Sequence, residues 1–128
     1  MKDTHLLTLE DFFSKYAGTP YKDMDCWQLV SVFYKEVLGV DLPNLYSFIT
    51  RPTNDIDANK IVNETISNYT KVEVPRFGDV MLINIKKLPC HVAVYLDRTL
   101  LIHSTRDQGV CVDKIFRWQK RTQGYYRC

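Results

Sequence analysis

The chain has 128 residues and a mass of 15.0 kDa, with 45% apolar and 25% charged residues. These proportions are typical of a globular protein and exclude a disordered chain, because enough apolar surface is present to offset chain entropy. The length predicts a single domain over residues 1–128. A net charge of +2 is too small to indicate a nucleic-acid-binding protein.

Neither a membrane span nor a leader is expected from the sequence. No apolar run approaches the roughly 20 residues needed to cross a bilayer, so we predict no membrane insertion. The first 13 residues mix acidic residues into their apolar stretch and lack a small-residue cleavage site, which predicts no signal peptide.

Four cysteines lie at positions 26, 90, 111 and 128, without a CxxC pair. This pattern favours free thiols in a reducing compartment over a disulfide scaffold. A zinc site built from Cys90, His91, His103 and Cys111 is disfavoured, because adjacent residues of a strand point to opposite faces. We therefore expect no metal and no organic cofactor.

The first half of the chain has helical spacing. Thr8 can cap a helix over residues 9–17 that ends at Gly18, and Asp25 can cap a second helix that begins at Cys26 and ends before Gly39. A weaker helical pattern covers 58–67, after a loop-like stretch from Pro43 to Asp57.

From Tyr69 onward the apolar pattern alternates. Short β-branched segments are predicted as strands at 70–74, 79–85, 91–96, 99–105 and 109–113, with a further strand at 124–127. Helices followed by sequential strands predict an α+β fold with N-terminal helices packed on an antiparallel sheet.

Cys26 is the candidate nucleophile. At the first turn of a helix, the dipole and the unpaired backbone N–H groups favour a thiolate and can stabilise an oxyanion, so we expect its pKa to lie below that of a free thiol. The alternative is a small buried apolar residue on the inner face of the helix, which is the commoner role of a single cysteine.

Two histidines favour the chemical role. A cysteine nucleophile needs an imidazole base and a third group that orients it. His91 and His103 each interrupt an aliphatic strand, where an imidazole is costly to bury without partners, whereas His5 has no such context.

These segments resemble a known family. DCWQLVSVFYKEVLGVDLP resembles the nucleophile helix of the NlpC-type cell-wall cysteine peptidases, which are papain-like. FGDVMLINI, HVAVYL, LLIHST and GVCVD resemble the core strands of that family in order, and the resemblance covers roughly residues 9–113.

The resemblance implies a role for each matching residue. Cys26 matches the nucleophile, His91 the base and His103 the third polar residue, and Tyr21 matches a tyrosine near the oxyanion site. The chain departs from cell-wall hydrolases of the family in lacking a Gly-rich stretch between Tyr21 and Cys26, and Trp27 stands where a serine is usual. Asp-Cys-Trp and the closing W-x(6)-YYR are more similar to the bacteriophage tail-associated branch, and we place Trp27 with Tyr21 in the expected substrate and oxyanion region.

The resemblance thus implies a cysteine endopeptidase that cleaves peptidoglycan stem-peptide bonds and belongs to a phage or prophage tail. Its expected partners are a peptidoglycan peptide and other tail proteins, in the virion tail or the bacterial cytoplasm. Two alternatives stay open: a tail-assembly or tail-tip structural protein with little hydrolytic activity, and an acyltransferase that uses the same thioester.

The hairpin between the two histidine strands carries a geometric prediction. His91 and His103 can touch only on one sheet face, and their spacing then requires a turn with an odd number of residues, such as 96–98, or a bulge. A two-residue turn at Asp97-Arg98 would place the rings on opposite faces, and neither residue favours such a turn. We expect both imidazoles to face the beginning of the Cys26 helix.

Overall fold

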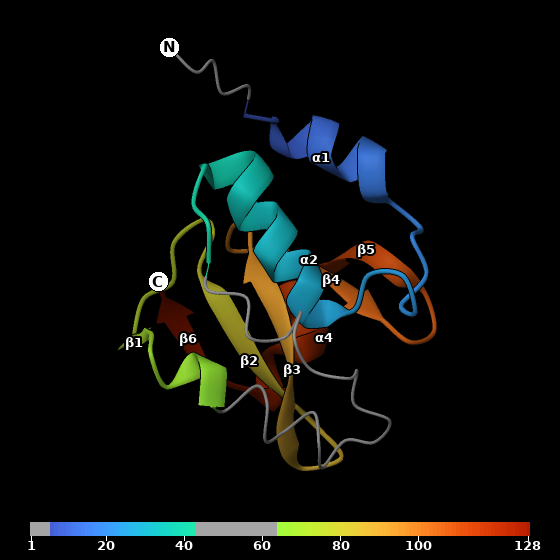
Figure 1. Ribbon diagram of the computed structural model, residues 1–128. Coiled ribbons are helices and arrows are strands. Elements are labelled where there is room, and N and C mark those ends of the chain that lie inside the picture. Colours follow the sequence, from blue (N-terminus) through green and yellow to red (C-terminus); the bar gives the residue numbers. More distant parts are fainter. Residues whose placement is uncertain (1–5, 43–63) are drawn as a thin grey trace.

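The computed structural model describes residues 6–42 and 64–128. Two helices precede a six-stranded sheet, and a short helix precedes the last strand (Figure 1). The elements are α1 Leu9–Tyr16, α2 Cys26–Phe33 with its π-helical continuation Tyr34–Leu38, β1 Thr70–Val72, β2 Val80–Ile85, β3 Leu88–Tyr95, β4 Leu100–Thr105, β5 Gly109–Lys114, α4 Ile115–Trp118, the 3-10 turn Gln119–Arg121 and β6 Thr122–Arg127. The predicted loop at 43–57 and most of the predicted helix at 58–67 lie outside the described residues, although 64–66 are helical.

The N-terminal helices begin where the sequence predicts. The Thr8 hydroxyl accepts a hydrogen bond from the Asp11 N–H at 3.1 Å and caps α1. Asp25 and Gln28 form a reciprocal capping box at the start of α2, which fixes the position of the first turn. Gly39 ends the π-helical continuation with a left-handed backbone.

All strand pairs are antiparallel, in the order β1-β6-β2-β3-β4-β5. The α+β prediction is therefore confirmed. Each strand begins and ends within three residues of its predicted bounds, and the largest difference is at β3, which begins three residues early.

Both faces of the sheet are covered. On one face, α2 packs over alternate strand residues and Phe12 of α1 packs on Phe33 of α2. This core contains Phe12, Leu29, Val30, Phe33, Val80, Leu82, Val92, Val94, Ile102 and Val110. On the other face, α4 contributes Ile115 and Trp118 to a smaller cluster with Met81, Ile83, Ala93, Tyr95, Leu101 and Tyr125. The short helix α4 was not predicted, because four residues are too few for a helical period to emerge.

The β3–β4 hairpin has an odd-length turn, as predicted. Tyr95 pairs with Leu101, and the Leu96 and Asp97 N–H groups both donate to the Leu100 carbonyl. The Asp97 carboxylate closes the turn by accepting from the Thr99 and Leu100 N–H groups. This register gives odd-numbered residues of both strands the same face, which places His91 and His103 together.

Within residues 6–42 and 64–128, no helix is long and apolar enough to span a bilayer.

Candidate active site

Cys26 is the first residue of α2, and its side chain is 4% exposed. Its Sγ lies 4.0 Å from the Tyr21 hydroxyl and accepts a hydrogen bond from the Val92 backbone N–H. Val92 immediately follows His91 in β3, so the thiol is hydrogen-bonded to the backbone of the strand that carries the candidate base.

Burial changes the acidity of this thiol in the opposite direction from the one expected. Burial and then the negative charge of Asp25 raise the pKa of Cys26 to about 12, although the Val92 N–H and the Tyr21 hydroxyl act against this shift. The expectation of a lowered pKa is therefore wrong for this arrangement. Desolvation outweighs the effect of the helix terminus, and Cys26 is a neutral thiol here.

His91 and His103 form a buried pair. His91 Nε2 and His103 Nδ1 lie 3.0 Å apart, within hydrogen-bond distance. The other ring nitrogen of His103, Nε2, lies 3.6 Å from Asp113 Oδ2, which is longer than a normal hydrogen bond. Asp113 Oδ2 also accepts a hydrogen bond from Trp118 Nε1 at 2.9 Å.

The sequence patterns do not identify Asp113 or Trp118 as site residues. They place Asp113 in a strand and Trp118 in the closing motif. The signal for Asp113 lies in strand pairing. His103 of β4 pairs with Cys111 of β5, and Asp113, two residues further along β5, therefore lies on the same face of the sheet. No local pattern could have identified Trp118.

The two rings lie on the face of the sheet that α4 covers. The centroid of the Trp118 ring is 5.9 Å from that of His91 and 4.9 Å from that of His103. The prediction that both imidazoles face the beginning of α2 is not borne out: both rings pack against Trp118, and His91 meets the α2 side only through the pocket that it shares with Tyr21. Within the described residues, no hydrogen bond joins Cys26 to His91.

Both imidazoles are neutral at pH 7. Burial, followed by His103 and by the positive charges of Arg121 and Arg106, lowers the pKa of His91. Burial also lowers the pKa of His103, and the Asp113 carboxylate offsets only part of that effect. The site thus holds a neutral thiol and two neutral rings.

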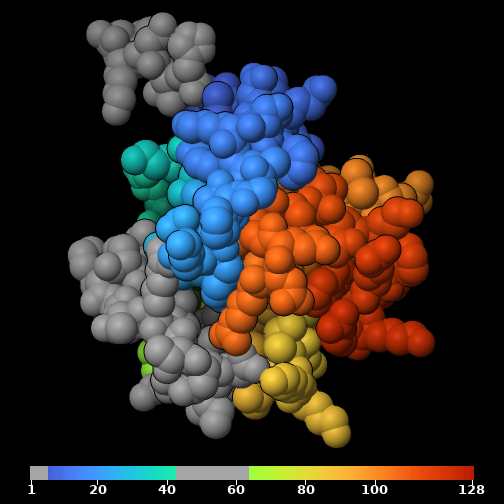
Figure 2. Space-filling model, turned by 90° about the vertical axis from the view of Figure 1, so that its right-hand side faces the viewer, coloured from blue at the N-terminus to red at the C-terminus, as the bar shows by residue number. Residues whose placement is uncertain are grey.

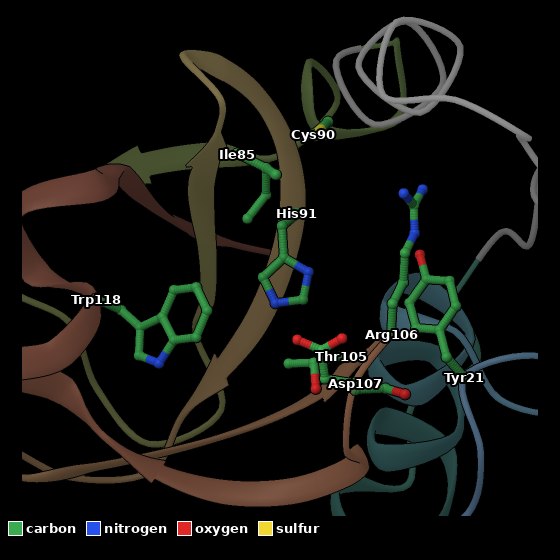
Figure 3. Close-up of a pocket in the computed structure, with 9 residues that line it drawn as sticks. Tyr21, Ile85, Cys90, His91, Thr105, Arg106, Asp107 and Trp118 are labelled. Atoms are coloured by element: carbon green, nitrogen blue, oxygen red, sulfur yellow. The ribbon is translucent and has the colours of Figure 1, made fainter.

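A pocket of about 200 Å³ opens beside His91. Figure 3 shows the His91 ring between Trp118 on one side and Tyr21 with Arg106 on the other. The remaining lining residues are Ile85, Cys90, Ser104, Thr105 and Asp107. Tyr21 lines the pocket and also contacts Cys26 Sγ, and so connects the thiol to the space beside the base.

The segment before α2 is held in place by β5. Gly18 N–H donates to the Val110 carbonyl, and the Val110 N–H donates to the Thr19 carbonyl. In Figure 2 this blue segment lies directly against the orange β4–β5 hairpin. These bonds determine where Tyr21 enters the pocket.

The structure does not bring the Trp27 side chain to the pocket. Its indole is 1% exposed and packs against Tyr69 in the core, with ring centroids 6.1 Å apart. Trp27 can therefore contribute to the site only its backbone N–H, in the first turn of α2.

The four cysteines are free thiols. Cys90 is buried at the pocket wall, Cys111 is half-buried and Cys128 is exposed. Within the part of the chain that the structure describes, no group of three or more His, Cys, Asp or Glu residues could hold a metal ion.

The fold and this arrangement define a papain-like α+β domain with a cysteine at a helix start and a histidine pair on the sheet. Residues 14–127 match the model of the NlpC/P60 family, and the chain belongs to that family. Members of this family are generally cysteine peptidases that act on peptidoglycan.

A solved structure described as similar to a lipoprotein of the NLP/P60 family, from Staphylococcus aureus, has the same fold. It superposes with a TM-score of 0.59 at 20% sequence identity, over 99% of this chain. The chain spans 44% of the length of that protein. Comparison with curated protein sequences gives no match.

Proposed function

We propose that this protein is a cysteine endopeptidase that cleaves peptide bonds in peptidoglycan stem peptides, with Cys26 as nucleophile, His91 as base and His103 as the group that orients His91. The observation that carries the proposal is the hydrogen-bonded His91–His103 pair, one residue from the backbone N–H that contacts the Cys26 thiol. Family membership supports the same chemistry.

The reaction begins from neutral partners. With a thiol of high pKa and an imidazole of low pKa, proton transfer accompanies attack rather than preceding it. His91 takes the thiol proton through Nδ1, because Nε2 is bonded to His103. This step requires the His91 ring and Sγ to come closer when substrate binds, and catalytic hydrogen bonds commonly shorten in this way in the substrate complex.

The remaining steps follow from the groups around the thiol. Sγ forms a bond to the scissile carbonyl carbon, and the oxyanion is stabilised by the N–H groups at the start of α2 and by the Tyr21 hydroxyl. His91 returns its proton to the leaving nitrogen as the C–N bond breaks. Water then attacks the thioester, with His91 again as base, and releases the acid and the free thiol.

We further propose that the protein acts within a phage or prophage tail and contacts other tail proteins. The Asp25-Cys26-Trp27 sequence and the closing Trp118…Tyr125-Tyr126-Arg127 segment support this placement by resemblance.

The test is digestion of purified peptidoglycan, followed by mass analysis of the released fragments. The wild-type protein should release muropeptides cut within the stem, Cys26→Ser should release none, and Cys128→Ser, which alters an exposed thiol, should behave as wild type. An unchanged profile with wild-type protein would instead favour a structural tail protein. Transfer of the peptide to an added amine in preference to water would favour the acyltransferase.

A further inference from the structure

Asp113 lies at the end of a chain of buried polar groups that leads to the candidate base. His91 Nε2 and His103 Nδ1 are 3.0 Å apart, and His103 Nε2 is 3.6 Å from Asp113 Oδ2. The His103 side chain is fully buried, and its Nε2 has no hydrogen-bond partner among the described residues. The carboxylate is therefore the charge that this nitrogen faces.

The carboxylate is ionised at neutral pH. Partial burial raises the pKa of Asp113, but hydrogen bonds from Trp118 Nε1 and the Lys114 N–H, together with His103 and Arg117, hold it below its ordinary value. A negative charge at 3.6 Å favours the N–H form of the facing nitrogen over a lone pair. His103 is therefore protonated on Nε2 and carries a lone pair on Nδ1.

The tautomer of His103 determines that of His91. Because His103 Nδ1 is an acceptor, the 3.0 Å contact requires His91 Nε2 to be the donor. The lone pair of the neutral His91 ring then lies on Nδ1. That is the nitrogen that must accept the thiol proton, because Nε2 is already engaged.

We propose that Asp113 is a positioning residue that sets the tautomers of His103 and, through it, of His91. The part of this inference that concerns catalysis rests on the proposed function, whereas the tautomers themselves do not. Asp113 acts through its charge and through its fixed orientation, since Trp118 and the Lys114 N–H each hold one carboxylate oxygen.

Replacing Asp113 with Asn together with Trp118→Phe should reverse this order. The second change removes the Trp118 Nε1–H, which would otherwise keep the amide oxygen at the position of Oδ2. The amide oxygen then stays on the Lys114 N–H, and the NH₂ group replaces Oδ2 and donates toward His103 Nε2. His103 then protonates on Nδ1, His91 Nε2 becomes the acceptor, and His91 Nδ1 carries the proton and can no longer act as a base. A wrong tautomer of this kind lowers kcat by about 10⁴-fold in a serine protease, and we expect a loss of at least about 10²-fold here.

The experiment is long-range ¹H–¹⁵N correlation NMR on histidine-labelled protein at pH 7, combined with hydrolysis assays. Wild-type protein should show His91 and His103 in the Nε2–H form, and the Asp113→Asn, Trp118→Phe double variant should convert them to the Nδ1–H form with a fall in kcat. Trp118→Phe alone is the matched control; it should leave both tautomers unchanged, because the Asp113 carboxylate still faces His103 Nε2.

The NMR readout separates this inference from the proposed function. An Nδ1–H signal from His103 in the wild-type protein would overturn the inference, even if the double variant failed to fold. Unchanged tautomers in a folded Asp113→Asn, Trp118→Phe variant would also overturn it. Correct tautomers in a protein that hydrolyses no peptide would support the role of Asp113 and contradict the proposed function instead.

Discussion

The hydroxyl of Tyr21 contacts Cys26 Sγ at 4.0 Å from the pocket wall. From there it can donate a hydrogen bond to an oxyanion that forms beside the thiol. We expect Tyr21→Phe to lower kcat by about 10²-fold, as the loss of one oxyanion donor commonly does, while KM changes little. Steady-state hydrolysis of a stem-peptide substrate measures this effect.

Tyr16→Phe provides the control for that substitution. Tyr16, at the end of α1, donates to Glu36 at 2.6 Å and does not line the pocket, so its loss should cost about 1 kcal/mol of stability and no activity. Equal kinetic effects from both variants would show that Tyr21 contributes only to folding.

Asp25 has two effects on the helix that carries Cys26. Its carboxylate caps α2 by accepting from the Gln28 N–H at 2.9 Å, and its negative charge raises the pKa of Cys26. Asn caps helices as well as Asp, so Asp25→Asn should keep the free energy of unfolding within about 0.5 kcal/mol of wild type while it lowers the pKa of the thiol. The pH dependence of Cys26 alkylation, followed by peptide mapping, should shift to lower pH.

The matching variant is Asp25→Ala, which removes the cap along with the charge. It should show the same shift in thiol acidity and lose about 1 kcal/mol of stability. If alkylation of Cys26 has the same pH dependence in all three proteins, burial alone determines its acidity.

Gly109, at the start of β5, allows the close approach of the segment that leads to Tyr21. Its φ is +68°, and a Cβ atom there would lie 2.1 Å from the Thr19 carbonyl oxygen. Gly109→Ala should therefore destabilise the fold by more than the roughly 1–2 kcal/mol of left-handed strain, because backbone must also move. Urea denaturation measures the loss.

A substitution at Gly18 is the control that separates the cost of left-handed backbone strain from the cost of a steric clash. It has a similar φ of +81°, but a Cβ atom would meet nothing within 4 Å. Gly18→Ala should lose only the left-handed strain, about 1–2 kcal/mol. The prediction for Gly109 is wrong if the two variants are equally stable.

Local signals were enough to predict where the helices and strands lie along the chain, but neither the place of β6 between β1 and β2 nor the details of the site. The Asp25 cap, Gly39 and the alternating strands are each readable within a few residues, and each is found in the structure. The role of Asp113 depends on which residues face each other across β4 and β5. The high pKa of Cys26 depends on burial by segments distant in the sequence. The position of Cys26 at the start of a helix does not reveal this burial.

At the scale of the whole molecule, the buried histidine pair links stability to pH. In the folded protein the pKa values of His91 and His103 lie below the ordinary value of 6.5, mainly because of burial. At pH 7 the rings are neutral in the folded protein and mostly neutral in the unfolded chain, so they affect stability little there. Below about pH 6.5 the unfolded chain binds two protons that the folded protein excludes, and stability falls as the pH decreases.

This link predicts a loss of about 2 kcal/mol in the free energy of unfolding between pH 6 and pH 5, since each histidine contributes up to about 1.4 kcal/mol per pH unit. Asp97 and Asp113 have lowered pKa values and titrate below this range, so they do not obscure it. Urea titrations at pH 7, 6 and 5 measure the slope, and His103→Gln should reduce it by about half because one of the two protonation sites is removed. Constant stability from pH 7 to pH 5 in the wild-type protein would mean that the folded protein takes up these protons as readily as the unfolded chain, and that the pair is not held neutral by burial.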